Sequence, residues 1–272
     1  MQNNNETMRL LFDTELYAYR LCLAHTEEYE WDKGEVSAFI RVEEVLKSML
    51  CDLRHLENLA IELAPVESIV LCHGDTGRSF RRQVYPEYKR NRTGRKPLGY
   101  GSVMELILSA AQDSGTTEAP IQTLAVPHDL LEGDDAMGIE ARPGDALVSI
   151  DKDFWTLPGT QIAFRPWDPD RTFEVVETNL GQANYNLFIQ ALTGDKADGY
   201  PGCPGVGPVK AAKLLQPGMS EAELWDATLQ AFLQAGHTES FALSMVQCAR
   251  ILRPGEYDRE RRLPILWKPP AG

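Results

Sequence analysis

The chain has 272 residues, of which 43% are hydrophobic and 25% charged, with a net charge of −13. This composition suits one α/β domain with its own core, or one domain and a smaller appended piece. No apolar run approaches the roughly 18 residues of a membrane span, and the polar, Asn-rich start does not resemble a secretory signal. Five scattered cysteines without a C-x-x-C pair argue against a disulfide framework and a cysteine zinc site, which favours a reducing, intracellular location.

The acidic average hides one basic segment. Residues 78–96 contain eight Lys or Arg and a single acid, Glu87, so the remainder of the chain is more acidic than the average indicates. A basic segment of this kind can hold a phosphate backbone, and part of the acidic remainder can hold metal ions.

Apolar runs and helical spacing predict alternating strands and helices. Strands are expected at 8–12, 68–72, 121–126 and 146–150, and a hairpin is expected at 161–165 and 172–176. Helices are expected at 36–60, 78–92 (in part), 103–114, 127–142, 181–193, 210–215 and 221–252. This alternation predicts an α/β fold with a mostly parallel sheet flanked by helices. We expect a catalytic core at 1–193 and a helical lobe at 194–272.

Acidic residues follow the predicted strands. Asp13, Asp75 and Asp151 each stand at or just beyond a strand end, where sites form in open α/β sheets. Glu132, Asp134 and Asp135 stand at the start of a predicted helix, and Asp153 follows Asp151 by two residues. Asp195 and Asp198 come directly after a predicted helix. Any one of these acids alone fits a turn former or a helix cap. Nine together predict an all-oxygen site for two Mg²⁺ or Mn²⁺ ions, the usual arrangement for phosphodiester hydrolysis.

The basic segment interleaves cations with tyrosines. Arg81, Arg82, Lys89 and Arg92 can grip phosphates, and the ring of Tyr88 can stack on a base. On a helix, Lys89 and Arg92 would face one way and clamp the scissile phosphate opposite the metals. The alternative is a solvated basic helix face whose tyrosines belong to the core.

A glycine-rich turn separates two predicted helices. Gly205, Val206 and Gly207 precede Lys210 and Lys213, so backbone N–H groups and lysines can hold a phosphate without reading base sequence. Gly194, Asp195 and Lys196 come shortly before. The glycine triplet alone is weak evidence, and its neighbours strengthen it.

Four motifs in fixed order resemble the 5′-nuclease superfamily, which includes flap endonucleases, the 5′-nuclease domain of bacterial DNA polymerase I and bacteriophage 5′–3′ exonucleases. They are Tyr85–Arg92 (YPEYKRNR), Glu132–Asp135 (EGDD), Asp151–Asp153 (DKD) and Thr193–Leu215. The compact size resembles the phage exonucleases most. A PIN-like core with a helix–hairpin–helix lobe of the H3TH type is the fold that this resemblance implies.

The resemblance also implies roles. One metal is assigned to the acids at 13, 75, 132, 134, 135 and 151, and the second to those at 153, 195 and 198. Asp13, Asp134 and Asp153, with Lys89 and Arg92, are the expected catalytic residues. Tyr88 matches a base-stacking tyrosine. The DNA-binding residues expected are Arg81, Arg82, Tyr88, Lys89, Arg92, Lys196, Gly205, Val206, Gly207, Lys210 and Lys213, with K⁺ bound at the glycine turn.

The implied activity is Mg²⁺-dependent 5′–3′ exonuclease action, with flap endonuclease and RNase H-like cutting. Expected substrates are duplex DNA with 5′ ends or short flaps and RNA–DNA hybrids. We expect a monomer, unattached to membranes, in the cytoplasm of a bacterial or phage-infected cell. Ile150 stands where the family usually has Gly, and the stretch 93–101 is short for a full helical arch, which argues against threading of a long flap. Two alternatives are a non-catalytic DNA-binding scaffold on this fold and a PIN-type ribonuclease.

Overall fold

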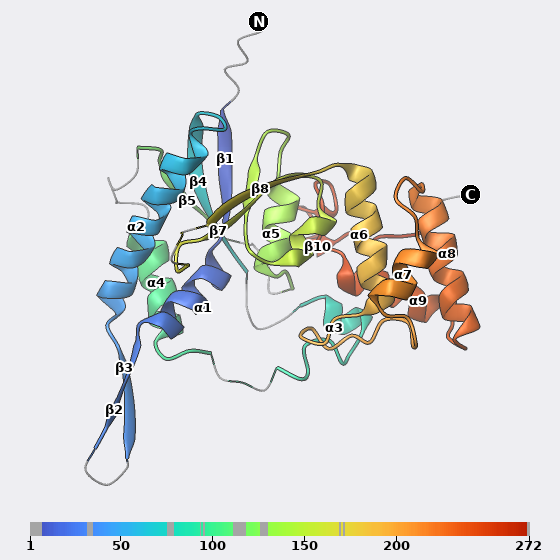
Figure 1. Ribbon diagram of the computed structural model, residues 1–272, viewed down its shortest axis with the longest axis horizontal. Helices are drawn as coiled ribbons and strands as arrows, with labels where there is room; N and C mark the ends of the chain where they lie inside the picture. Colours follow the sequence, from blue (N-terminus) through green and yellow to red (C-terminus); the bar gives the residue numbers. More distant parts are fainter. Residues whose placement is uncertain are drawn as a thin grey trace, which may run out of the picture.

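The computed structural model describes residues 7–31, 35–74, 79–92, 94, 96–110, 118–125, 130–168, 170 and 172–270. Its centre is a six-stranded sheet in the order β5-β4-β1-β6-β7-β8 (Figure 1). Every neighbouring pair is parallel except β7 and β8, which form the predicted antiparallel hairpin. The prediction of a mostly parallel sheet is therefore confirmed. The strands are β1 (Met8–Asp13), β4 (Val66–His73), β5 (Ile121–Ala125), β6 (Ala146–Val148), β7 (Gly159–Arg165) and β8 (Thr172–Thr178).

The inner strands are buried on both faces, as their continuous apolar runs require. Leu10 and Phe12 of β1 point into one core cluster, and Leu11 between them points into another. The first cluster is covered by α1 (Thr14–Ala24), α2 (Val42–Ala60) and α4 (Tyr100–Ala110). The second is covered by α5 (Gly133–Glu140), the 3-10 helix η2 (Lys152–Thr156) and Ile251. Helices on both faces leave the carboxyl edge of the sheet open for a site.

A two-stranded hairpin interrupts the chain between α1 and α2. It consists of β2 (Thr26–Glu30) and β3 (Val36–Ile40), and it projects from the body on the side away from the helices α6 to α9 (Figure 1). The helix predicted from residue 36 was therefore wrong at its start, since α2 begins only at Val42. Val36, Phe39 and Ile40 are β-branched or aromatic residues with a preference for strands, and β2 supplies their pairing partner.

The helical lobe has its own hydrophobic core. It is built from α6 (Leu180–Thr193), α7 (Pro208–Leu214), α8 (Glu221–Gln234) and α9 (Glu239–Ala249) around Phe188, Trp225 and Phe232. Helix α6 contributes to this core, so the core extends across the predicted boundary at 193, and the division into two parts stays a prediction. The chain then returns to the sheet, and the short strands β9 (Tyr257–Asp258) and β10 (Leu263–Pro264) pair near its end. Among the described residues, every helix is too short or too polar to cross a bilayer.

Candidate active site

The carboxyl edge of the sheet gathers acids from three elements. Asp13 ends β1 and is only 6% exposed; its side chain caps α1 by accepting the N–H of Leu16 at 3.2 Å. The Ser149 hydroxyl, just after β6, donates to the other oxygen of Asp13 at 2.8 Å. Asp151 follows in the same loop, and Asp134 lies in the first turn of α5. The strand ends thus bring together residues far apart in the sequence.

These carboxylates repel one another. Burial raises the pKa of Asp13 to about 6, and the charge of Asp151 adds to the shift. Burial and the charges of Asp13, Asp151 and Glu132 raise the pKa of Asp134 well above its usual value, although Lys89 opposes this. A divalent cation would neutralise the group, and carboxylate oxygens are ligands that Mg²⁺ and Mn²⁺ prefer. The chemistry of these side chains therefore fits a hard metal ion.

Asp153 links the sheet edge to the helical lobe. The Asp151 side chain caps η2 by accepting the N–H of Asp153 at 3.0 Å. One oxygen of Asp153 accepts a hydrogen bond from Gln190 of α6 at 2.8 Å. Burial, with repulsion from Asp151, Asp198 and Asp195, raises the pKa of Asp153 to about 7. The acids predicted for the second metal thus lie beside those predicted for the first.

Asp195 and Asp198 occupy a turn that the end of α6 makes possible. Gly194 caps α6 with φ of +68°, a backbone conformation that favours glycine. One oxygen of Asp195 accepts the N–H groups of Ala197 and Asp198 at 2.7 and 3.1 Å, and the other pairs with Lys152 at 3.0 Å. Burial alone would raise the pKa of Asp195, but these bonds and the Lys152 charge lower it. Asp195 therefore shapes the turn and stays ionised.

The basic segment approaches as a turn. Within the described residues 79–92 only α3 (Arg81–Val84) is helical, so the partly helical segment predicted up to about residue 92 ends earlier than predicted. Pro86 cannot donate to a continuing helix, and Lys89 has φ of +52°, which no right-handed helix allows. Lys89 donates its backbone N–H to the Asp198 carbonyl at 2.6 Å, which anchors the segment to the turn of the lobe.

Lys89 and Arg92 still point into the acidic site. The Lys89 Nζ lies 2.6 Å from Glu132 and 3.7 Å from Asp198, and Arg92 lies 2.5 Å from the other oxygen of Asp198. Burial would lower the pKa of Lys89, but the charges of Glu132 and Asp198 outweigh this effect and raise it. The ammonium group of Lys89 is therefore held charged at the edge of the carboxylate group.

Tyr88 does not match its predicted role. Its side chain is 2% exposed and its ring stacks on Tyr200, with centroids 6.3 Å apart. Its hydroxyl lies 3.0 Å from Glu132 and 2.7 Å from Asp198. A ring that stacks on a base must expose one face to it, whereas the Tyr88 ring is buried. The prediction that Tyr88 stacks on a base was therefore wrong. Tyr88 instead positions the acids beside Lys89.

Arg81 and Asp135 form a buried ion pair, which also contradicts their predicted roles. Arg81 is 2% exposed and Asp135 is fully buried, and two nitrogens of Arg81 bind the two oxygens of Asp135 at 2.7 and 2.8 Å. Arg81 also donates to the carbonyls of Cys248 and Arg250, and the N–H of Leu252 donates to Asp135. Arg81 therefore cannot reach DNA, and Asp135 has no oxygen left for a metal. The pair locks α5 to the end of α9.

The other predicted DNA contacts lie at the surface, with one exception. Arg82, Lys196, Lys210 and Lys213 are exposed, whereas Val206 is buried and offers only its backbone. Gly205 has φ of +72° and open space around it, and Gly207 caps α7. DNA binding by these residues stays a prediction.

The acids separate into two kinds. Within the described residues, no three acidic, histidine or cysteine side chains already surround a single ion position. Four of the predicted metal ligands form salt bridges with Lys or Arg side chains: Glu132, Asp135, Asp195 and Asp198. Among the described ion pairs none involves the remaining predicted ligands, Asp13, Asp134, Asp151 and Asp153. Asp75, the ninth predicted ligand, lies outside the described residues.

Besides Ser149, three residues of the site were not predicted from the sequence. Glu15 lies two residues after Asp13 in the first turn of α1, and burial, with repulsion from Asp13, raises its pKa to about 7. Lys152 and Gln190 bind Asp195 and Asp153 from η2 and α6. Glu15 follows the pattern of acids after strands, so its position could have been noticed. Nothing in the local sequence marks Gln190.

The raised pKa of Asp153 predicts a pH effect on stability. A folded-state pKa of about 7, against an ordinary 3.8, means that the folded protein holds this proton more tightly than the unfolded chain. This stabilising contribution is complete below about pH 4 and is lost as the pH rises through about 7. In EDTA, the Tm of the wild type should therefore fall relative to that of Asp153→Asn between pH 5 and pH 8. A constant difference in Tm across this range would contradict the assignment.

Comparison with known proteins supports the class that the motifs predicted, the 5′-nuclease superfamily, because the relatives found are named exonucleases and flap endonucleases. No family model matches it. It is similar to the exodeoxyribonuclease of Enterobacteria phage T3, with 27% identity over 74% of this chain and 73% of the relative. The exonuclease of Escherichia phage T7 is 26% identical over 74% of each chain. The flap endonuclease Xni of Shewanella sp. strain MR-4 is 33% identical over 60% of this chain and 62% of the relative.

Solved structures give a weaker likeness. The T5 D15 protein crystallised with metal ions has a TM-score of 0.48 and 16% identity, and the alignment covers 89% of this chain and 93% of that one. The T5 5′-exonuclease with bound zinc has a TM-score of 0.46 and 16% identity, over 90% of this chain and all of the other.

Proposed function

We propose that this protein is a divalent-metal-dependent nuclease that hydrolyses phosphodiester bonds of duplex DNA from 5′ ends or short 5′ flaps. The observation that supports this most is the group of mutually repelling carboxylates at the sheet edge, with a charged lysine held beside it. The names of the phage and bacterial relatives, exonuclease and flap endonuclease, support the same reaction.

Asp13, Asp134, Asp151 and Asp153 are the proposed holders of Mg²⁺ or Mn²⁺. When bound, the ions supply an activated water molecule and stabilise charge on the phosphoryl oxygens. Ser149 and Leu16 orient the carboxylate of Asp13, and Gln190 orients that of Asp153. These hydrogen bonds hold the carboxylates of Asp13 and Asp153 at the sheet edge, from which the acids would close around the ions.

Lys89 and Arg92 are proposed to contact the reacting phosphate. Both side chains reach the site, where Lys89 binds Glu132 and Arg92 binds Asp198. A phosphate is a competing acceptor for the same cations. Exposed Arg82, Lys196, Lys210 and Lys213, with the backbone of Gly205 and Gly207, are proposed to hold the duplex through its phosphates. K⁺ at the glycine turn, cutting of RNA–DNA hybrids and a monomeric state remain predictions.

Digestion of end-labelled duplex DNA tests the proposal. We expect 5′ label to be released early as mono- or short oligonucleotides in Mg²⁺, and no release in EDTA. Early release of 3′ label would contradict the polarity. Binding without cleavage in Mg²⁺ and Mn²⁺ would favour the DNA-binding scaffold instead, and faster cutting of RNA than of DNA would favour the PIN-type ribonuclease.

A further inference from the structure

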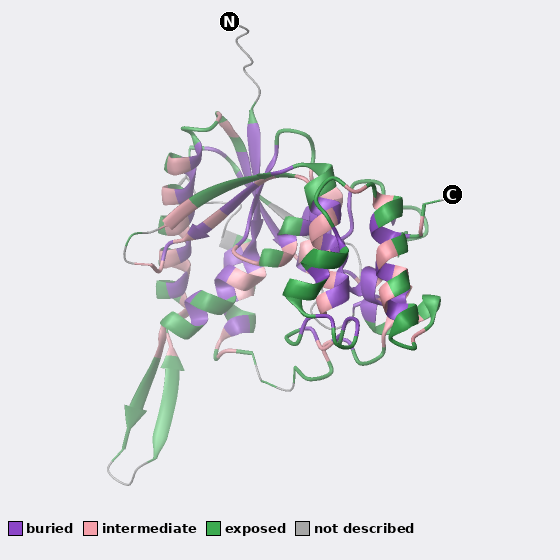
Figure 2. Cartoon of the chain, turned by 45° about the vertical axis from the view of Figure 1, so that its right-hand side comes forward, coloured by how far each residue is buried: buried purple, intermediate pink, exposed green. Residues whose placement is uncertain are grey.

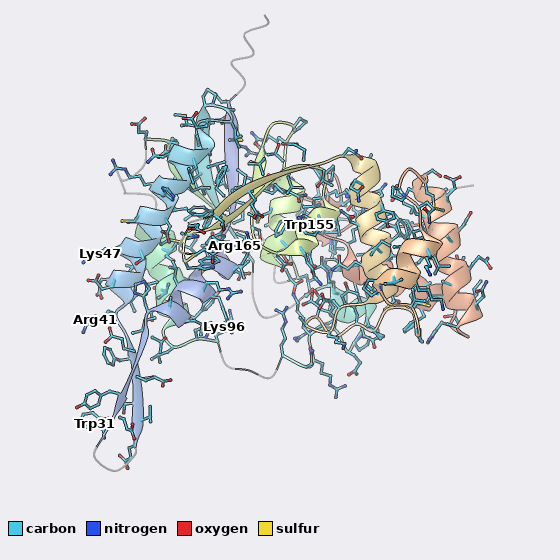
Figure 3. The ribbon with its side chains drawn as sticks, viewed as in Figure 1. Trp31, Arg41, Lys47, Lys96, Trp155 and Arg165 are labelled. Carbon is cyan, nitrogen blue, oxygen red and sulfur yellow. The ribbon has the colours of Figure 1, made fainter. Side chains whose placement is uncertain are left out.

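The β2–β3 hairpin presents three aromatic side chains on one face. Its register pairs Glu27 with Phe39 and Tyr29 with Ser37, and the N–H of Trp31 bonds to the Glu35 carbonyl. Alternate residues of a strand share a face, so the aromatic residues at 29, 31 and 39 lie together. Tyr29 and Trp31 are each 55% exposed and Phe39 is 40% exposed. Figure 3 shows Trp31 far out on the hairpin, away from the body of the protein.

These rings are held in place without being buried. The Tyr29 and Trp31 rings meet edge to face with centroids 4.8 Å apart, and the indole N–H donates to the Ser37 hydroxyl at 3.0 Å. In the described sheets β2 and β3 pair only with each other, and Figure 2 shows both strands exposed over most of their length. A projecting element with an ordered, exposed apolar face is typical of a contact site for another molecule.

The negative charge of the hairpin indicates which kind of molecule binds to its aromatic face. Residues 26–40 contain five acids and one lysine. Glu27 and Glu35 flank the aromatic face, and Glu28 and Glu30 lie on the opposite face. Such a surface repels a phosphate backbone, which argues against DNA. Carboxylates and aromatic faces both attract Arg and Lys side chains.

The hairpin already takes part in a contact of this kind. The Arg41 guanidinium lies 5.8 Å from the centroid of the Phe39 ring at the base of the hairpin (Figure 3). Nearer the tip of the hairpin, the ring of Trp31 is larger than that of Phe39, and the ring of Tyr29 is equal to it in size. We propose that the aromatic face of the hairpin, formed by Tyr29, Trp31 and Phe39 with Glu27 and Glu35, binds an Arg- or Lys-bearing segment of a protein partner.

A labelled peptide tests this proposal. Fluorescence anisotropy would measure binding of an eight-residue peptide with alternating Arg and Ser, and of a matched Glu–Ser peptide, to the full-length protein. Tyr29→Ala/Trp31→Ala should weaken binding of the basic peptide about tenfold, the loss expected when two cation–π contacts disappear. The matched control is Val36→Ala, because Val36 is 61% exposed on the opposite face. It should keep the wild-type affinity within about twofold, and the Glu–Ser peptide should not bind.

The two variants should also cut DNA at the wild-type rate, which shows that they are folded. Equal affinity of the wild type and Tyr29→Ala/Trp31→Ala for the basic peptide would overturn the proposal. So would weaker binding of duplex DNA by this variant with unchanged peptide binding, since the face would then contact DNA. Loss of self-association in the variant, without any change in peptide affinity, would assign the face to a second copy of the chain and would also overturn it.

Discussion

Asp134→Asn should abolish cleavage while making the metal-free protein more stable. In the wild type, burial and the charges of Asp13, Asp151 and Glu132 oppose ionisation of Asp134. The amide carries no charge, so in EDTA the Tm should rise by roughly 2–4 °C for each kcal/mol of relieved repulsion. Loss of a metal-binding carboxylate should lower kcat by about 10³-fold or more.

The neighbouring acid is the matched control. Asp135→Asn places an amide against Arg81 and breaks a fully buried ion pair, at a cost of roughly 3–5 kcal/mol. Its Tm should therefore fall where that of Asp134→Asn rises. Thermal unfolding in EDTA, with cleavage measured in Mg²⁺ below both transitions, checks the pair. Full activity of Asp134→Asn, or a lower Tm than the wild type, would contradict the roles assigned here.

Lys89→Ala should slow the chemical step and leave DNA binding nearly intact. The ammonium group is held charged at the edge of the carboxylate group and is proposed to stabilise charge on the reacting phosphate. Removal of one such donor typically costs about 10²–10³-fold in kcat. Single-turnover cleavage, with DNA binding measured in Ca²⁺, separates the two effects.

Arg90→Ala removes one positive charge from the same turn and serves as the control. Arg90 is exposed and pairs only with Glu87 among the described ion pairs, three residues away. We expect at most a small loss of affinity and an unchanged kcat. If Lys89→Ala and Arg90→Ala weaken binding alike and leave kcat unchanged, Lys89 merely attracts DNA.

The fold was predictable wherever burial imposes a pattern. The apolar runs of β1, β4, β6 and β7 mark strands buried on one or both faces, and the acids that follow them had to meet at the carboxyl edge. The β2–β3 hairpin left no such pattern. Its strand Thr26–Glu30 is polar and exposed on both faces, so nothing distinguishes it from a loop.

The errors in the site arise from partners distant in the sequence. Arg81 stands in a basic segment that suits DNA, yet its guanidinium binds a carbonyl 169 residues away and an acid 54 residues away. Asp135 and Asp134 are neighbours in the sequence. Asp135 points into the protein towards Arg81, whereas Asp134 points towards the carboxylates at the sheet edge. Spacing places both acids in the first turn of α5. The packing of residues 248–252 against Arg81 and Asp135 decides that Asp134, and not Asp135, is free to bind a metal.

Mn²⁺ binding tests the central claim most directly, because it measures the carboxylate site without DNA or catalysis. Electron paramagnetic resonance of free Mn²⁺ counts the ions that the protein removes from solution. The wild type and Arg90→Ala should bind about two ions, as two-metal phosphodiester hydrolysis requires. Asp134→Asn and Asp153→Asn should each bind fewer ions or bind them more weakly. Unchanged Mn²⁺ titrations in both carboxylate variants would contradict the claim that the acids at the sheet edge hold the catalytic metals.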